Sequence, residues 1–197
     1  MVKHSSFVVL LACVAAPAPA QSVPPEIAAE QVRIDFDSGT YVGTIGNSPM
    51  QKLAQSFRLY EAGPISHLML PLYCNNSWPL PTTASVAIQS LRNGLPSGRT
   101  LVRQDVPAHV LFAYPNPATP RDWGMRMLEF TSDWTLTPGD YAFVIEVSDG
   151  ACDILYGPSG DTYADGEAFY YAPLLWLGSP WRAWGRDLAF QVFQRPL

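Results

Sequence analysis

The sequence predicts an all-β protein, a two-sheet antiparallel β-sandwich of the jelly-roll type with about nine strands. Apolar residues alternate with period two in several segments, which is typical of strands with one buried face. Proline and glycine, which account for 19 and 14 of the 197 residues, interrupt the chain too often for long helices. Helical periodicity is weak, and only residues 24–31 are expected to form a short helical turn.

The expected strands follow one another along the chain. They are residues 32–36, 54–59, 68–72, 86–88, 101–106, 128–130, 141–147, 168–171 and 188–192. Asn93 and Gly94 begin a segment, ending at Gly98, that predicts a tight reversal between two strands, because glycine accepts positive φ and Pro96 fixes φ. Residues 107–122 are rich in proline and are expected to form a long loop at the edge of the sandwich.

A second turn predicts a device that supports the fold. Pro138 and Gly139 stand directly before Tyr141, which begins an alternating strand. This order is typical of a tyrosine corner, in which the phenol OH bonds back to the backbone across the turn. Tyr141 is therefore expected to have a structural role.

Several motifs occur in an order that resembles a known group of exported bacterial domains. They are Gln55-Ser56-Phe57, the alternating Leu68, Leu70 and Leu72, Val86-Ala87-Ile88 leading into residues 93–98, the turn 136–141, and the stretches 156–170 and 187–192. This order is similar to that of choice-of-anchor R type domains and of jelly-roll accessory modules attached to carbohydrate-active enzymes. The resemblance spans residues 55–193 and implies an exported, non-catalytic module that binds carbohydrate or an envelope component.

Residues 1–20 have the layout of a cleavable secretory signal. A basic start at Lys3 is followed by an apolar run over residues 7–16, which is too short to span a membrane, and by the exit Ala18-Pro19-Ala20. Cleavage there leaves a single domain, residues 21–197, that is secreted or periplasmic. In the alternative interpretation, residues 10–13 form a lipoprotein box and Cys13 carries a lipid anchor.

Two cysteines, Cys74 and Cys152, remain for the folded domain. An even pair in an oxidising compartment is expected to form a disulfide, with two buried free thiols as the alternative. The chain has a net charge of −5 and no cluster of Lys or Arg, so nucleic acid is not an expected partner.

Motifs for catalysis are not found. No serine lies in a Gly-x-Ser-x-Gly motif, and neither His67 nor His109 has metal ligands at a suitable spacing. Glu129 and Glu146 are expected on the polar faces of their strands, where they could lie on one sheet surface as the carboxylate pair of a glycosidase. A glycosidase or lyase is therefore the least favoured function, and no enzyme is expected.

An acidic, glycine-containing segment predicts a calcium site. Asp161, Asp165 and Glu167 are the candidate ligands, since calcium prefers six to eight oxygen atoms from such loops. The EF-hand pattern fails at Tyr163 and Ala172, so the ion would be structural and held in another way. A solvated acidic loop without metal is the alternative.

Aromatic residues give the main functional prediction. The candidate ligand-binding residues are Trp176, Trp181, Trp184, Arg182, Tyr163 and Trp78. Exposed loop tryptophans offer flat apolar surfaces on which sugar rings stack, and polar neighbours fix the orientation of the sugar. Two alternatives stay open: the tryptophans pack as lids over the core, or they contact a protein partner in the cell envelope.

Overall fold

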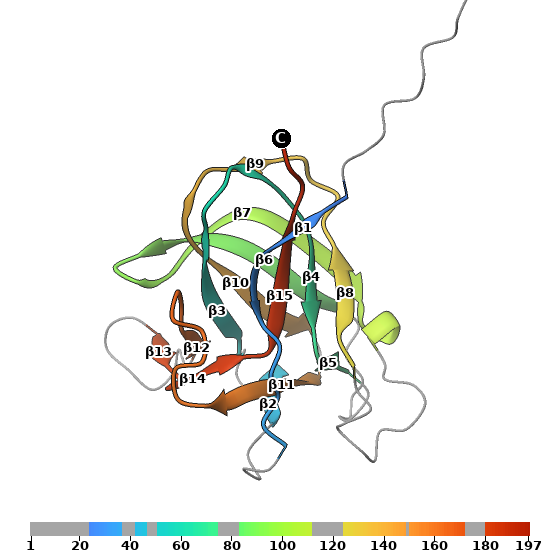
Figure 1. Cartoon of the computed structure of the whole chain (residues 1–197). Coiled ribbons are helices and arrows are strands. Elements are labelled where there is room, and N and C mark those ends of the chain that lie inside the picture. Colours follow the sequence, from blue (N-terminus) through green and yellow to red (C-terminus); the bar gives the residue numbers. More distant parts are fainter. Residues whose placement is uncertain are drawn as a thin grey trace, which may run out of the picture.

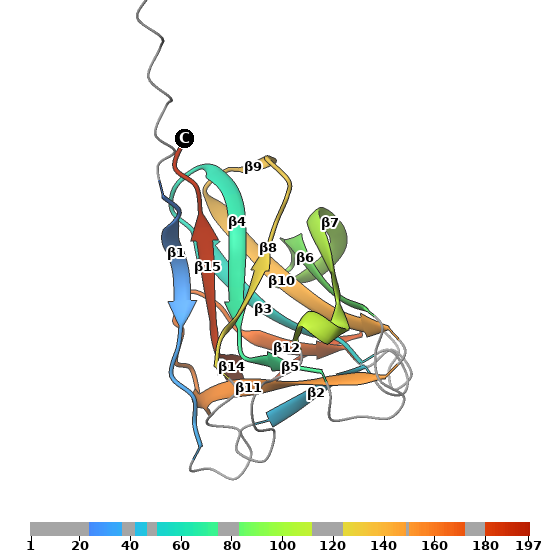
Figure 2. The same ribbon diagram turned by 90° about the vertical axis from the view of Figure 1, so that its right-hand side faces the viewer.

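The structure, a computed structural model, describes residues 24–36, 42–46, 51–74, 83–111, 124–148, 150–171 and 180–197. This part contains fifteen strands in three antiparallel sheets and one short 3-10 helix, η1 (Ala108–Leu111). The two larger sheets form layers that face each other, and the smallest sheet lies across one end of them (Figure 1, Figure 2). The all-β prediction is confirmed. The expected number of sheets and strands is not, because the described residues form three sheets with fifteen strands in total, in place of two sheets with about nine.

Each sheet combines strands that are distant in the sequence. The five-stranded sheet has the order β1 (Glu26–Gln31), β15 (Phe190–Gln194), β4 (Gly63–Leu70) and β8 (Arg126–Glu129), with β9 (Thr135–Leu136) also paired to β4. The six-stranded sheet has the order β13 (Trp181–Ala183), β12 (Ala168–Tyr171), β3 (Leu53–Leu59), β10 (Gly139–Ser148), β6 (Thr83–Arg92) and β7 (Leu95–Pro107). The four-stranded sheet has the order β14 (Arg186–Leu188), β11 (Ala151–Ser159) and β2 (Val42–Gly46), with β5 (Leu72–Tyr73) paired to β11.

The main core lies between the two large sheets. Alternation along β10 directs Tyr141, Phe143 and Ile145 into this core, where Phe143 packs edge-on against Phe190 with ring centroids 5.4 Å apart. Full burial of one such side chain contributes about 1.5–3 kcal/mol to stability. The inner faces of the two sheets are therefore buried in the core, and a ligand can reach only the outer faces.

The hairpin of β6 and β7 contains the predicted tight reversal. Arg92 pairs with Leu95, and the two residues between them, Asn93 and Gly94, have φ values of 53° and 75°. Positive φ at both positions is the signature of a type I′ turn, which matches the twist of a hairpin. Register shifts at Gln89 interrupt the pairing of the two strands, and such bulges bend strands. The tip residue Leu95 then packs on a small cluster on the outer face of the same sheet, made of Ala54, Val144, Phe169 and Trp181.

The tyrosine corner is confirmed. The hydroxyl of Tyr141 donates a hydrogen bond of 2.8 Å to the carbonyl oxygen of Thr137, four residues earlier. Gly139 lies between them with a φ of 157°. The bond ties the start of β10 to the chain that leaves β9.

Replacing Tyr141 by phenylalanine is expected to lower the free energy of unfolding by about 1 kcal/mol, because the carbonyl of Thr137 loses its partner while the ring stays in place. Urea denaturation followed by tryptophan fluorescence measures the difference. Tyr60→Phe is the matched control, since Tyr60 is 66% exposed, and it should change stability by less than about 0.5 kcal/mol. An equal effect of both substitutions would remove the corner as a source of stability.

Two of the predicted elements are wrong. Residues 24–31 do not form a helical turn: residues 26–31 are strand β1, which pairs with β15 from Glu26 opposite Gln194 to Gln31 opposite Phe190. Residues 32–36 form no strand, but Ile34 and Phe36 pack against a small cluster of Tyr73 and Leu155. The extra strands are mostly short, since β5 and β9 have two residues each and β13 and β14 have three, too few to show alternation.

The predicted disulfide is confirmed. Cys74, directly after β5, is bonded to Cys152 on β11, and both side chains are buried. The bond indicates an oxidising, extracytoplasmic environment. Among the described residues, no helix is long and apolar enough to cross a membrane. The predicted leader, Cys13 included, lies outside the described residues.

Candidate functional site

The outer face of the six-stranded sheet carries a row of side chains, one from each strand or its end. The row, here called the cross-strand row, consists of Trp181, Tyr171, Lys52, Glu146, Ser85 and Asp105. Backbone pairing sets its order, because Trp181 lies opposite Tyr171, Glu146 opposite Ser85 and Ser85 opposite Asp105. Lys52 joins the two halves: its carbonyl accepts a bond from the amide of Tyr171, and its ammonium contacts Glu146. Directly opposed residues of antiparallel strands point to the same face, so the six side chains share one surface.

One end of the row is aromatic. The rings of Tyr171 and Trp181 meet edge to face with centroids 5.0 Å apart. Trp181 is only 7% exposed because it packs in the outer cluster beneath Leu95, whereas Tyr171 is half-buried and reaches solvent. Both rings line a pocket of about 430 Å³ whose other wall is the tip of the β6–β7 hairpin, from Arg92 to Gly98. Tyr171 therefore supplies the accessible flat surface at this end.

The other end of the row is charged but balanced. The ammonium of Lys52 lies 2.7 Å from a carboxylate oxygen of Glu146 and 5.4 Å from the centre of the Tyr171 ring. Asp105 accepts hydrogen bonds of 2.6 Å from Ser85 and 2.9 Å from Arg103, and these bonds lower the pKa of its carboxyl group, with Ser85 as the main cause. Asp105 is thus held ionised. Lys52, Glu146, Ser85 and Arg103 line a second pocket of about 320 Å³.

The predicted tryptophan site divides between two faces. Trp184 packs against the main core, with its ring 5.2 Å from that of Tyr156 and 5.0 Å from that of Tyr170. Trp181 belongs to the separate cluster on the outer face. The two rings therefore do not form one platform, and for Trp184 the lid interpretation is the better description. Trp176 and Trp78 lie outside the described residues.

The other predicted ligand-binding residues serve the fold. Arg182 is half-buried and its guanidinium donates to the carbonyl oxygen of Trp181 at 2.8 Å. Tyr163 packs edge-on against Phe190 at 5.2 Å, and its hydroxyl accepts a bond from the backbone amide of Arg58. Neither side chain lines a pocket of the cross-strand row.

Two of the three candidate calcium ligands, Asp161 and Glu167, line one pocket of about 290 Å³, whereas Asp165 does not line it. Asp165 accepts a hydrogen bond of 2.8 Å from Tyr60 and lies 3.8 Å from the guanidinium of Arg58, while Asp161 and Glu167 are exposed. Within the described ranges, no group of three or more His, Cys, Asp or Glu side chains could hold a metal ion. The calcium prediction finds no support from these residues.

Glu129 and Glu146 do not lie on one sheet surface, so the less favoured alternative of a carboxylate pair is wrong. Glu129 is on β8 of the five-stranded sheet, whereas Glu146 is on β10 of the six-stranded sheet. Alternation predicted the outward direction of each side chain but not the sheet to which its strand belongs. His67, also on the outer face of the five-stranded sheet, stacks on Phe193 with ring centroids 4.1 Å apart.

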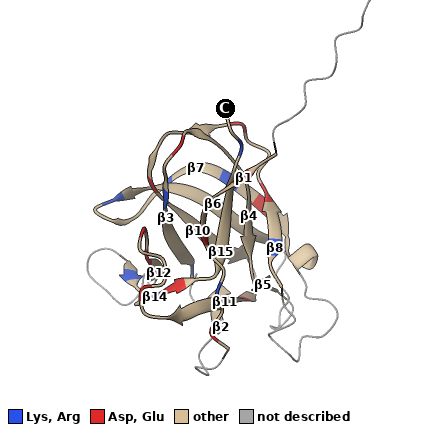
Figure 3. Cartoon of the chain, in the orientation of Figure 1, with Lys and Arg blue, Asp and Glu red and all other residues tan. Residues whose placement is uncertain are grey.

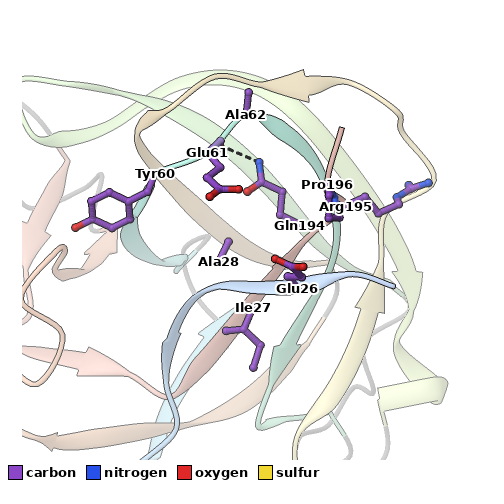
Figure 4. A pocket seen from close by; sticks show the side chains of 9 residues that line it. All are labelled: Glu26, Ile27, Ala28, Tyr60, Glu61, Ala62, Gln194, Arg195 and Pro196. Carbon is purple, nitrogen blue, oxygen red and sulfur yellow. Dashed lines mark hydrogen bonds between the residues drawn. The ribbon is translucent and has the colours of Figure 1, made fainter. Parts of the chain in front are cut away.

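A further pocket, of about 240 Å³, lies between the start of β1, the β3–β4 turn and the end of β15 (Figure 4). The carboxylates of Glu26 and Glu61 line it, and the side-chain amide of Gln194 donates to the carbonyl oxygen of Glu61 at 3.1 Å. The ring of Tyr60 points away from the centre of this pocket (Figure 4). It lacks the combination of an inward aromatic ring and paired polar groups found at the cross-strand row.

Most of the cross-strand row is not predicted by the sequence patterns. No motif in the sequence marks Lys52, Ser85 or Asp105 as site residues, and Tyr171 is predicted only as the end of a strand. One signal was available: Lys52 and Glu146 each stand at a polar position beside alternating apolar residues. Basic and acidic residues are interspersed over the described chain, so charge alone marks no site (Figure 3).

The comparisons with known proteins identify no family. The sequence matches no protein-family model and no curated protein significantly. Of the expected resemblance to choice-of-anchor R type domains, the structure supports the coarser part, an all-β domain of several antiparallel sheets.

Proposed function

We propose that the chain is an exported, non-catalytic binding module that recognises carbohydrate through the cross-strand row. Under this proposal the leader over residues 1–20 is removed and the sandwich, of jelly-roll type, presents the outer face of its six-stranded sheet to the ligand. The disulfide between Cys74 and Cys152 agrees with export, because it needs an oxidising compartment.

The main support for the proposal is that the cross-strand row has an aromatic end and a polar end on one surface. The exposed part of the Tyr171 ring offers a flat apolar surface for the C–H face of a sugar. The carboxylates of Glu146 and Asp105, with Lys52 and Arg103, offer strong acceptors and donors for hydroxyl groups, and their mutual bonds hold them in place. A few fixed polar groups beside an apolar surface are the usual composition of a small-molecule site.

The same geometry argues against a glycosidase. A general acid in such an enzyme needs a carboxyl group of raised pKa, whereas hydrogen bonds from Ser85 and Arg103 lower the pKa of Asp105. Glu146 is held in an ion pair with Lys52. Both carboxylates are better suited to accept hydrogen bonds than to donate protons.

Replacing Tyr171 by alanine is expected to weaken sugar binding roughly tenfold, because the stacking surface is lost. The measurement is calorimetric titration of the full folded chain with a panel of soluble oligosaccharides, with the tryptophan fluorescence of the protein as a second signal. The panel is repeated with a calcium chelator, which tests the prediction for Asp161, Asp165 and Glu167.

Trp134→Ala is the matched control, since Trp134 is an aromatic residue that is 60% exposed and lies away from the row, before β9. It should bind as the unchanged chain does. The proposal fails if no sugar in the panel binds, or if Tyr171→Ala and Trp134→Ala bind equally well.

A further inference from the structure

The two pockets of the cross-strand row are adjacent and lie along one line. The first is lined by Tyr171 and Trp181, the second by Lys52, Glu146, Ser85 and Arg103. Tyr171 and Lys52 are joined through the backbone and through the contact of the ammonium with the ring, so no strand separates the pockets. A ligand that enters one pocket can therefore continue into the other.

The line is long compared with one sugar ring. It runs across six neighbouring strands, from β13 to β7. Five strand spacings of about 4.8 Å give it a length of about 24 Å. Both of its end strands are sheet edges, since β13 pairs only with β12 and β7 only with β6 in the described part. A site of this shape fits the side of a polysaccharide better than its end.

Along the line the charged side chains are paired with one another, and Arg92 in the hairpin wall of the first pocket is one further cation. Lys52 is paired with Glu146 at 2.7 Å and Arg103 with Asp105 at 2.9 Å, so two cations face two anions. A polyanionic glycan needs cations that are not already neutralised, because its binding energy is largely electrostatic. Paired charges still donate and accept hydrogen bonds with hydroxyl groups.

Resting on the proposed function, we infer that the ligand is an uncharged, linear polysaccharide that lies across the strands and is recognised along its length. The apolar ring faces of the polysaccharide contact Tyr171, and sugar residues further along it form hydrogen bonds with the groups around Glu146 and Arg103. Short sugars reach only one pocket, while longer chains occupy both.

The test compares neutral disaccharides and hexasaccharides of glucose, xylose, mannose and galactose with hexasaccharides of galacturonic acid. The best neutral hexasaccharide is expected to bind at least about tenfold more tightly than its disaccharide, since hydrogen bonds to charged groups in the second pocket are gained. Arg103→Ala should reduce this ratio toward one, and Trp134→Ala should leave it unchanged.

A double variant tests whether the paired charges exclude charged ligands. Replacing Glu146 by glutamine and Asp105 by asparagine leaves Lys52 and Arg103 without their carboxylate partners but keeps the side-chain shapes. This double variant is expected to gain roughly tenfold in affinity for the galacturonic acid hexasaccharide, in a manner that salt abolishes.

The outcomes separate the inference from the function. Equal affinity for disaccharide and hexasaccharide, or tighter binding of galacturonic acid chains by the unchanged protein, overturns the inference while carbohydrate binding stands. Failure of every sugar to bind the unchanged protein overturns the proposed function as well.

Discussion

Loss of the disulfide is expected to lower the free energy of unfolding by about 4 kcal/mol. Cys74 and Cys152 are 78 residues apart in the sequence, so their bond closes a long loop and removes much of the conformational freedom of the unfolded chain. Stabilities of folded domains are about 5–15 kcal/mol, which makes this loss a large fraction of the total. The expected fall in the thermal midpoint is about 10 °C for a domain of this size.

The measurement is thermal and urea unfolding of the purified chain with and without a reductant, alongside a variant in which both Cys74 and Cys152 are alanine. Reductant should destabilise the unchanged protein and have no further effect on the double variant. An unchanged midpoint after complete reduction, checked by thiol labelling, would show that the bond contributes nothing to stability.

Local patterns predicted the parts of the fold that depend on neighbouring residues. The alternation on β10, the turn at Asn93 and Gly94 and the corner at Tyr141 each need only a few consecutive residues, and all three are confirmed. The prediction of a helical turn at β1 was wrong. The residues from Ile27 to Gln31 suit a helix by their own propensity, but pairing with β15 at the far end of the chain decides their conformation.

The cross-strand row depends on information that local patterns do not contain. Its members come from segments as far apart as Lys52 and Trp181, and only the register of the strands aligns them. The burial of Trp181 has a similar origin, since it depends on Leu95 packing from a bent hairpin. Alternation predicts which face a side chain takes but not its neighbours on that face.

Replacing Asp187 by alanine is expected to be nearly as damaging as loss of the disulfide, at about 4 kcal/mol. Asp187, on β14, is 2% exposed, and its carboxylate accepts four hydrogen bonds. The donors are the amide of Gln55 at 2.9 Å, the backbone amide and hydroxyl of Thr162 at 2.8 and 3.1 Å, and the backbone amide of Tyr163 at 2.9 Å. Without the carboxylate, these donors lose their acceptor in a place that water reaches poorly.

The structural consequence is local as well as global, because Asp187 fixes the segment that joins β11 to β12, and β12 carries Tyr171 of the cross-strand row. Urea denaturation gives the loss of stability, and hydrogen exchange at the amides of Thr162 and Tyr163 reports the loosened segment. Asp187→Asn should fall between the unchanged chain and Asp187→Ala, since one carbonyl oxygen remains as acceptor. Asp161→Ala, an exposed acidic residue of the same segment, should stay within about 0.5 kcal/mol of the unchanged chain. If Asp187→Ala and Asp161→Ala are equally stable, the buried carboxylate does not hold this segment in place.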